Sequence, residues 1–164
     1  MDDLDRRLID LFATDPRVGV LEASRRLGVA RGTVQARIDK LESSGVVTGY
    51  GPELSPDALG YPVTAFLTLE IRQGSAELSG RDGAGHDAVG THLAAIPEVL
   101  EAHTITGAGD LMCRVVARSN TDLQRVIDQI VGYEGIVRAS TIIVLAEQIA
   151  YRTTPLVHAA ANRP

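Results

Sequence analysis

The sequence contains one cysteine and no long hydrophobic run. Cys113 has no second cysteine with which to form an intramolecular disulfide, which fits a reducing cytoplasm, and its apolar neighbours are typical of a buried side chain. No apolar run approaches the roughly 20 residues that a membrane span requires. The acidic N-terminus also lacks the apolar core of a secretory signal. We therefore expect a cytoplasmic protein with no membrane segment.

Motifs that carry enzymatic or metal chemistry are missing as well. The four histidines lack the spacing of a metal site, because no HExxH or CxxC motif occurs. Neither a phosphate-binding P-loop nor a GxSxG nucleophile turn is present, and the GAGD tetrapeptide is too short for a dinucleotide-binding motif. We expect neither an enzyme nor a bound metal or cofactor.

The net charge of −5 argues against simple electrostatic binding of nucleic acid, but the charge is unevenly distributed. Residues 17–40 hold six basic and two acidic side chains, whereas residues 51–164 carry the whole net negative charge. A local basic patch is typical of phosphate contact. A solvated helical face would have the same composition, so charge alone does not separate the two interpretations.

The first 50 residues have the apolar spacing of three short helices. We expect helices over residues 3–14 and 20–27, and a third from Arg31 that ends near Ser43. Only about three residues separate the second helix from the third, and a short strand is expected over residues 46–50. This order predicts a winged helix-turn-helix domain over residues 1–50.

The remainder predicts a second domain of the α+β class. Residues 51–62, rich in proline and glycine, are expected to form a linker. Strands and helices then alternate as βαββαβ, the ferredoxin-like order, over residues 63–149. A mobile loop is expected at 74–85 and a polar, poorly ordered tail at 150–164. The expected elements are a strand at 63–71, a helix at 87–95, strands at 99–106 and 111–117, a helix from Asn120, and a strand at 137–149.

The run LDRRLIDLF, followed by RVGVLEASRRLGVARGTVQARIDKLESSGVVTGY, resembles the N-terminal domain of the Lrp/AsnC (feast/famine) regulators. The later segments EVLEAHTITGAGDLMCRVVA and STIIVLAE are similar to the effector-binding and assembly domain of that family. The resemblance covers residues 3–148. It implies a transcription regulator that binds double-stranded DNA and responds to an amino acid or related metabolite. It also implies a homodimer, formed through the sheet domain, that assembles further, often to an octamer.

The outer face of the third helix is expected to read DNA bases. Gly32 and Ala36 lie opposite the core-facing Val34, and their small side chains permit close approach to a major groove. Thr33 and Gln35 flank them and can bond base edges, Gln35 to adenine in particular.

Basic side chains around this face are expected to bind phosphate. Arg31, near the start of the third helix, can reach guanine or phosphate. For Arg37 an ion pair with Glu22 or Glu42 is an equal alternative. The residues assigned to phosphate are Arg25, Arg26, Arg37 and Lys40.

Two features of the third helix are unfavourable. Asp39 points a negative charge toward the expected DNA side. Ala30 stands where the family usually has a serine that caps this helix, and losing such a cap costs about 1 kcal/mol.

The second expected site is the loop of Thr106, Gly107, Ala108, Gly109 and Asp110. Glycines expose backbone N–H groups that suit a carboxylate, and Asp110 can bind an α-ammonium group. From residue types alone a tight hairpin is the more favoured interpretation. The family resemblance instead implies an effector loop, with Ser140 and Thr141 as further contacts supplied by a neighbouring dimer.

Two other functions fit parts of the pattern. One is a ligand-independent architectural protein that wraps DNA. The other is a winged-helix regulator of a different family that responds to another kind of molecule.

Overall fold

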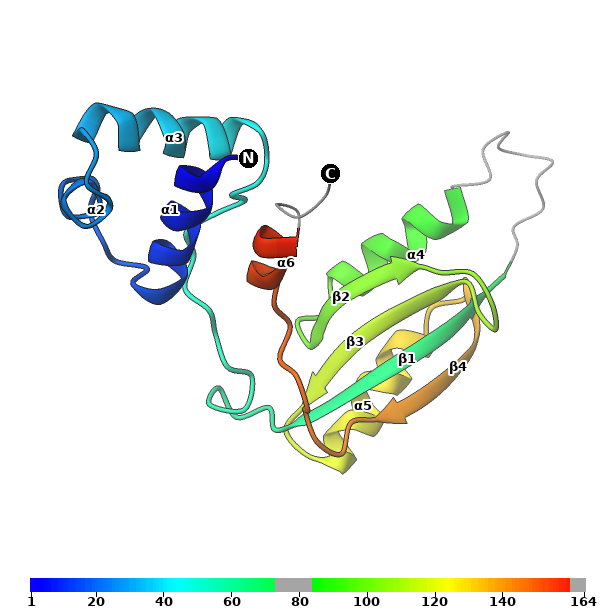
Figure 1. Ribbon diagram of the computed structural model, residues 1–164. Helices are drawn as coiled ribbons and strands as arrows, with labels where there is room; N and C mark the ends of the chain where they lie inside the picture. Colours follow the sequence, from blue (N-terminus) through cyan, green and yellow to red (C-terminus); the bar gives the residue numbers. More distant parts are fainter. Residues whose placement is uncertain (73–83, 160–164) are drawn as a thin grey trace. The chain divides into compact units, whose positions relative to one another are not determined.

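The computed structural model describes residues 1–72 and 84–159 (Figure 1). The chain divides into two units, one made of residues 1–52 with 148–164 and the other of residues 53–147. No helix among the described residues is both long and apolar enough to cross a membrane.

Three helices form the N-terminal part of the first unit, as the apolar spacing predicts: α1 (Asp3–Thr14), α2 (Val20–Leu27) and α3 (Arg31–Ser43). Gly28 ends α2 with φ of 71°, a left-handed conformation that glycine adopts without strain, and this allows the chain to turn directly into α3. The helices enclose a small apolar core of Leu8, Ala23, Leu27, Val34, Ile38 and Leu41.

The strand expected over residues 46–50 does not form. The N–H groups of Val46 and Val47 instead donate to the carbonyl oxygen of Leu41, at 3.0 and 3.1 Å. The Tyr50 hydroxyl lies 2.9 Å from a carboxylate oxygen of Glu42. Because the end of α3 takes up these backbone donors, the segment folds back on that helix and does not form a wing.

The tail expected over residues 150–164 contains a short helix, α6 (Thr154–Ala159). It packs against α1 (Figure 1), where His158 Nε2 lies 3.0 Å from Asp10 Oδ1. Residues 160–164 lie outside the described residues.

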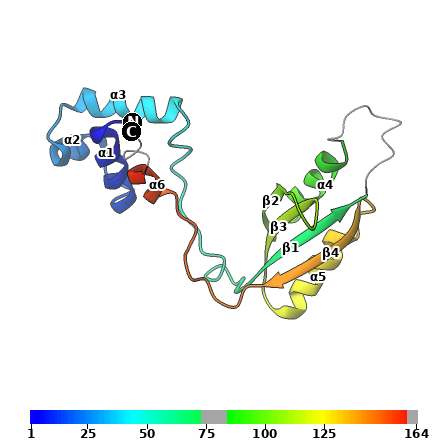
Figure 2. The same cartoon turned by 45° about the vertical axis from the view of Figure 1, so that its right-hand side comes forward.

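The second unit is a four-stranded antiparallel sheet with two helices, in the predicted βαββαβ order (Figure 2). The strand order β2-β3-β1-β4 is that of a ferredoxin-like fold. The elements are β1 (Val63–Ile71), α4 (Ala84–Ala94), β2 (Val99–Thr104), β3 (Leu111–Ala117), α5 (Asn120–Val131) and β4 (Ile136–Ile143).

Three boundaries differ from the predicted ones by more than one residue. Strand β2 ends at Thr104, and β4 ends at Ile143, where its pairing with β1 stops at Ala65. Helix α4 begins at Ala84, inside the loop predicted over 74–85, and the rest of that loop lies outside the described residues.

The sheet buries one face. Alternate residues of β1, from Ala65 to Ile71, pack with apolar side chains of α4 and α5. Cys113 is fully buried in this core, and burial raises the pKa of its thiol to about 11, as expected of a side chain that serves packing. The other face carries Thr64, Phe66 and Thr68 of β1, and no described helix covers it.

Candidate DNA-binding and effector sites

The turn between α2 and α3 is closed by backbone hydrogen bonds. The N–H groups of Gly28 and Val29 donate to the Ser24 carbonyl at 3.0 and 3.1 Å. The buried stripe of α3, which includes Val34 and Ile38, packs on the core and leaves the opposite side of the helix exposed. Helix α3 is therefore held in place by one side only.

The exposed side of α3 has the residues predicted for base contact. Gly32, Thr33, Gln35 and Ala36 are all exposed, and a Cβ added at Gly32 would meet no described atom within 4 Å. Ala30 is the N-cap, and no side chain caps the helix there, as its sequence implies. We call the outward-facing residues 31–33, 35, 36 and 39 the outer face of α3.

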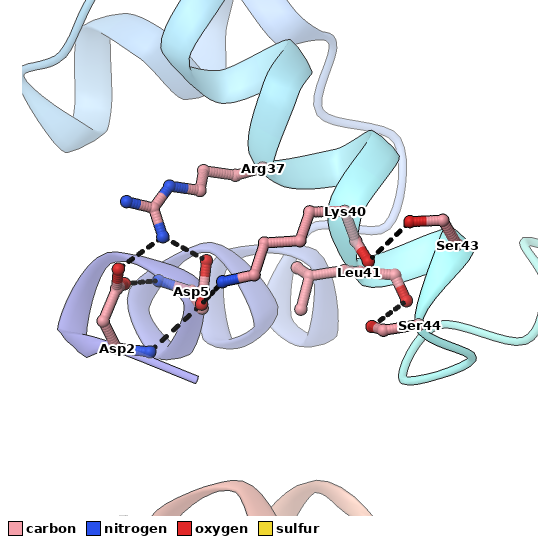
Figure 3. Close-up of polar contacts among 7 residues, drawn as sticks. All are labelled: Asp2, Asp5, Arg37, Lys40, Leu41, Ser43 and Ser44. Carbon is pink, nitrogen blue, oxygen red and sulfur yellow. Dashed lines mark hydrogen bonds and ion pairs between the residues drawn. The ribbon is translucent and has the colours of Figure 1, made fainter.

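Two of the predicted phosphate-binding residues form ion pairs with acids at the start of α1 (Figure 3). The Asp5 side chain is 0% exposed and lies 3.1 Å from Arg37 Nη1 and 3.2 Å from Lys40 Nζ. Asp2 also contacts Arg37, and it exchanges backbone-to-carboxylate hydrogen bonds of 3.0 Å with Asp5 in a capping box. These contacts tie the start of α1 to the second half of α3.

Figure 3 also shows two side-chain hydrogen bonds at the C-terminal end of α3. The Ser43 hydroxyl donates to the Lys40 carbonyl at 3.1 Å, and the Ser44 hydroxyl donates to the Leu41 carbonyl at 3.2 Å. Both carbonyl groups also accept backbone N–H groups, Lys40 from Ser44 and Leu41 from Val46 and Val47, so the two hydroxyls add further hydrogen bonds at the end of the helix.

The electrostatics of this cluster favour the charged forms of its members. Burial raises the pKa of Asp5, but hydrogen bonds from the Asp2 N–H, Lys40 and Arg37 lower it by more, so the pKa lies below the ordinary 3.8. Hydrogen bonds to Asp2 and Asp5 raise the pKa of Arg37. Among the described residues Arg37 pairs with Asp2 and Asp5, and not with Glu22 or Glu42, the alternative partners that the sequence suggests.

The sequence does not reveal that Asp5 supports α3. An acid at the N-cap and another three residues later mark a capping box, so its role within α1 was open to prediction. Its contacts with Arg37 and Lys40 join residues more than 30 positions apart, and local spacing contains no information about them.

The other basic residues differ in how closely their side chains are paired with acids. Arg26 lies 3.0 Å from both Glu22 and Asp15, and the hydrogen bond to Glu22 is the main cause of its raised pKa. Arg25 is more exposed, and its nearest acid is Glu22 at 3.7 Å. Arg31 is exposed and has no ion pair within residues 1–72 and 84–159. Arg25 and Arg31 are thus the most available cations of the predicted set.

Gln35 is held by a neighbour on its own helix. Its Nε2 atom donates to Asp39 Oδ1 at 2.8 Å, and both side chains are exposed. The acid that the sequence places unfavourably on the outer face of α3 therefore has a hydrogen-bonding partner there.

The predicted effector loop connects β2 to β3 and is pressed against β1. Gly107 has φ of 117°, in the region that favours glycine. A Cβ at Gly109 would overlap the Thr68 methyl group and lie 3.1 Å from the Leu69 carbonyl oxygen. The close approach to β1 therefore requires glycine at position 109.

Asp110 anchors the end of this loop. Its N–H donates to the Leu69 carbonyl at 2.9 Å, and its Oδ2 accepts the Ile71 N–H at 2.7 Å. One carboxylate oxygen of Asp110 therefore has a structural partner in β1.

Ser140 and Thr141 point to opposite faces of the sheet. Ser140 pairs with Thr68, so it shares the uncovered face with the threonine that touches Gly109. Thr141 pairs with Leu67, whose side chain faces the helices. Of the two residues, the structure brings only Ser140 near the loop on the same face.

No cluster of three His, Cys, Asp or Glu side chains suited to a metal ion occurs in the part of the chain that the structure describes.

Two family models match the sequence. The model of the AsnC-type helix-turn-helix domain matches residues 1–42, and that of the Lrp/AsnC ligand binding domain matches residues 64–154. The first match falls on α1 to α3, and the second includes all four strands of the sheet from Thr64 onward.

Individual proteins match over nearly the full chain. Regulatory protein AsnC of Escherichia coli is 30% identical over 156 residues, which cover 94% of this chain and 97% of that protein. The structure of E. coli AsnC superposes with a TM-score of 0.81 at 29% identity, covering 94% of this chain and 99% of that one. The feast or famine regulatory protein from M. tuberculosis, complexed with L-methionine, has a TM-score of 0.76 at 27% identity and covers 93% and 97%.

Proposed function

Since the chain belongs to the Lrp/AsnC family of DNA-binding transcription regulators, we propose that it recognises particular DNA sequences through α3 and that an amino acid adjusts its DNA affinity or assembly. It is a transcription regulator and not an enzyme. The observation that carries the DNA-binding proposal is the exposed outer face of α3, which has small residues at its centre and polar residues at its sides.

On this face we assign base contacts to Gln35 and Thr33, with Gly32 and Ala36 allowing close approach. Arg31 and Arg25 are the main phosphate contacts, because they are the least engaged with acids of the same unit.

Three cations have a second role. Arg37 mainly fixes α3 against α1 through Asp5 and Asp2, and Arg26 and Lys40 reach phosphate only while shared with their acidic neighbours. Such contacts position the protein on DNA and carry little sequence information.

For the effector we propose an amino acid, as in the relative that is complexed with L-methionine. The N–H groups of the loop from Thr106 to Gly109, with Ala108 and Gly107 at its tip, suit the α-carboxylate. The second carboxylate oxygen of Asp110, together with Ser140, suits the α-ammonium group. Thr141 joins such a site only from a neighbouring subunit, because it faces the other side of the sheet.

We further propose a homodimer formed through the uncovered face of the sheet, with assembly beyond the dimer to an octamer. Arg114 lies on this face beside Phe66, and its Nε atom is buried without a hydrogen-bond partner among the described residues. An unpaired buried donor costs free energy, and a shift of the Arg114 side chain toward an acceptor on a second copy would remove that cost. A dimer would present two α3 helices to half-sites about one helical turn of DNA apart.

Binding to a library of DNA sites, measured at several salt concentrations, tests the DNA-binding proposal. Gln35→Ala should change which sequences are preferred, because it removes a base contact. Arg31→Ala should weaken binding to all sequences and reduce the salt slope by about 1. Uniform weakening by both variants would contradict the assignment of Gln35 as a base reader.

A further inference from the structure

The amide of Gln35 is restrained on the outer face of α3. Its Nε2 donates to Asp39 Oδ1 at 2.8 Å, one helical turn further along. We propose that Asp39 is a positioning residue for DNA recognition, which orients the Gln35 amide so that the protein prefers adenine to guanine at the base that Gln35 reads. This inference rests on the proposed function, in which α3 enters the major groove.

The chemistry of a carboxylate fixes the orientation of the amide. A carboxylate accepts hydrogen bonds and cannot donate one, so the amide nitrogen of Gln35 must face Asp39. The reverse orientation would bring the Gln35 carbonyl oxygen against a negatively charged acceptor. Oε1 therefore points away from Asp39, and one of the two amide N–H bonds is already used.

The groups that remain on Gln35 match adenine. One N–H and the carbonyl oxygen are left, a donor beside an acceptor. In the major groove adenine offers an N7 acceptor and an N6 donor, which pair with these two groups.

Guanine does not match the restrained amide. Its major-groove edge offers two acceptors, N7 and O6. A free glutamine can turn both N–H bonds toward them, but Gln35 has only one N–H left and would set its carbonyl oxygen against an acceptor. By taking up one donor, Asp39 removes the arrangement that guanine requires.

The Gln35–Asp39 pair can influence base preference because of its position on the outer face of α3. Gln124 and Asp128 of α5 make the same contact at the same spacing, also at 2.8 Å, in the sheet unit. Such pairs are ordinary helix-surface contacts. Only the pair on α3 lies beside Gly32 and Ala36, where a groove can approach. The α5 pair is therefore a matched control.

The test is competitive binding of the full-length protein to sites that carry adenine or guanine at the base read by Gln35. Asp39→Asn keeps the shape of the side chain, but asparagine can also donate to Gln35 Oε1 and so frees both Gln35 N–H bonds. We expect this variant to lower the preference for adenine by about fivefold or more, the scale of a lost bidentate contact. Asp39→Glu, which only accepts, should keep the preference, and Asp128→Asn should leave it unchanged.

The Gln35→Ala background separates positioning from a direct effect of the charge. Removing the negative charge at position 39 should raise the affinity for all sites with either residue at position 35. It should alter the adenine preference only when Gln35 is present. Unchanged preference in Asp39→Asn, loss of preference in Asp39→Glu, or the same change without Gln35 would overturn the inference.

Failure of the proposed function has a different signature. If the wild-type preference survives Gln35→Ala, then Gln35 does not read that base, and the inference fails together with the base-reader assignment. If Gln35→Ala removes the preference and Asp39→Asn does not, only the role of Asp39 is wrong.

Discussion

At the scale of single residues, Asp5 connects the stability of the first unit to the placement of α3. It is fully buried, and its carboxylate meets both Arg37 and Lys40. A buried carboxylate that is paired with cations is stable only while both partners remain. The position of α3 therefore depends on a residue that has no contact with its outer face.

Asp5→Asn should destabilise the protein by about 1–3 kcal/mol. This is less than for a fully buried ion pair, because Lys40 is half exposed and solvent screens its charge. Asp3→Asn is the matched control: Asp3 lies in the same turn, its side chain is 71% exposed, and its ion pair is with the neighbouring Arg6. Urea denaturation of both variants measures the difference, and equal stabilities would contradict a structural role for Asp5.

The effect of Asp5→Asn should also depend on pH. The pKa of Asp5 is lowered in the folded protein, so the stability that its charge contributes is present above the ordinary 3.8 and is lost as the pH falls toward the folded pKa. The difference between wild type and Asp5→Asn should therefore shrink between about pH 6 and about pH 3. Thermal melts over this pH range measure the difference in stability. If the difference stays constant, the charge of Asp5 is not the cause of its stabilising effect.

Asp110 combines a structural bond with a proposed ligand contact, and two variants separate them. Asp110→Asn retains an oxygen for the Ile71 N–H but removes the charge that would bind an ammonium group. It should melt near the wild-type temperature and lose the shift that an amino acid causes. Asp110→Ala should in addition lose about 1–3 kcal/mol, because Ile71 is left without an acceptor. A full ligand shift in Asp110→Asn would remove Asp110 from the site.

Helical periodicity was sufficient to place Gln35, Ala36 and Thr33 on the exposed side of α3, because the angle around a helix follows from residue spacing alone. It was not sufficient to find the partners of Arg37. Those partners lie on another helix, and their contact depends on how α1 packs against α3.

At the scale of elements, the approach of the β2–β3 loop to β1 should be sensitive to a single methyl group. Gly109→Ala should destabilise the protein by about 1–3 kcal/mol, since the added Cβ overlaps Thr68 and crowds the Leu69 carbonyl. Gly90→Ala, in open space on α4, should be neutral or stabilising by up to about 1 kcal/mol. Thermal melts compare the two, and a neutral Gly109→Ala would mean that the loop can move away from β1.

Most elements can be predicted from the sequence. Within each of them the apolar residues recur at the spacing of either a helix or a strand, and turn-forming residues such as glycine and proline mark the ends. The strand expected at 46–50 failed because a strand needs a partner, and here the end of α3 accepts the backbone N–H groups. Helix α6 was missed because it is short and its place depends on α1, including the contact between His158 and Asp10.

At the scale of the whole molecule, the first unit carries little positive charge for a DNA-binding module. The basic patch at 17–40 amounts to +4, and in the structure Arg26, Arg37 and Lys40 are engaged with acids of the same unit. A single unit should therefore bind weakly, and two units joined by the sheet domain should bind far more tightly. This is why we assign the sheet domain a role in DNA binding, with its ligand acting through assembly.

The most direct test combines a melting-temperature screen against the twenty amino acids with DNA binding and light scattering in the presence of any amino acid that stabilises the protein. We predict that at least one amino acid raises the melting temperature and changes the DNA affinity about fivefold or more, or changes the size of the assembly. If no amino acid alters stability, affinity or size, the effector proposal is contradicted, and a ligand-independent protein that wraps DNA becomes the better account.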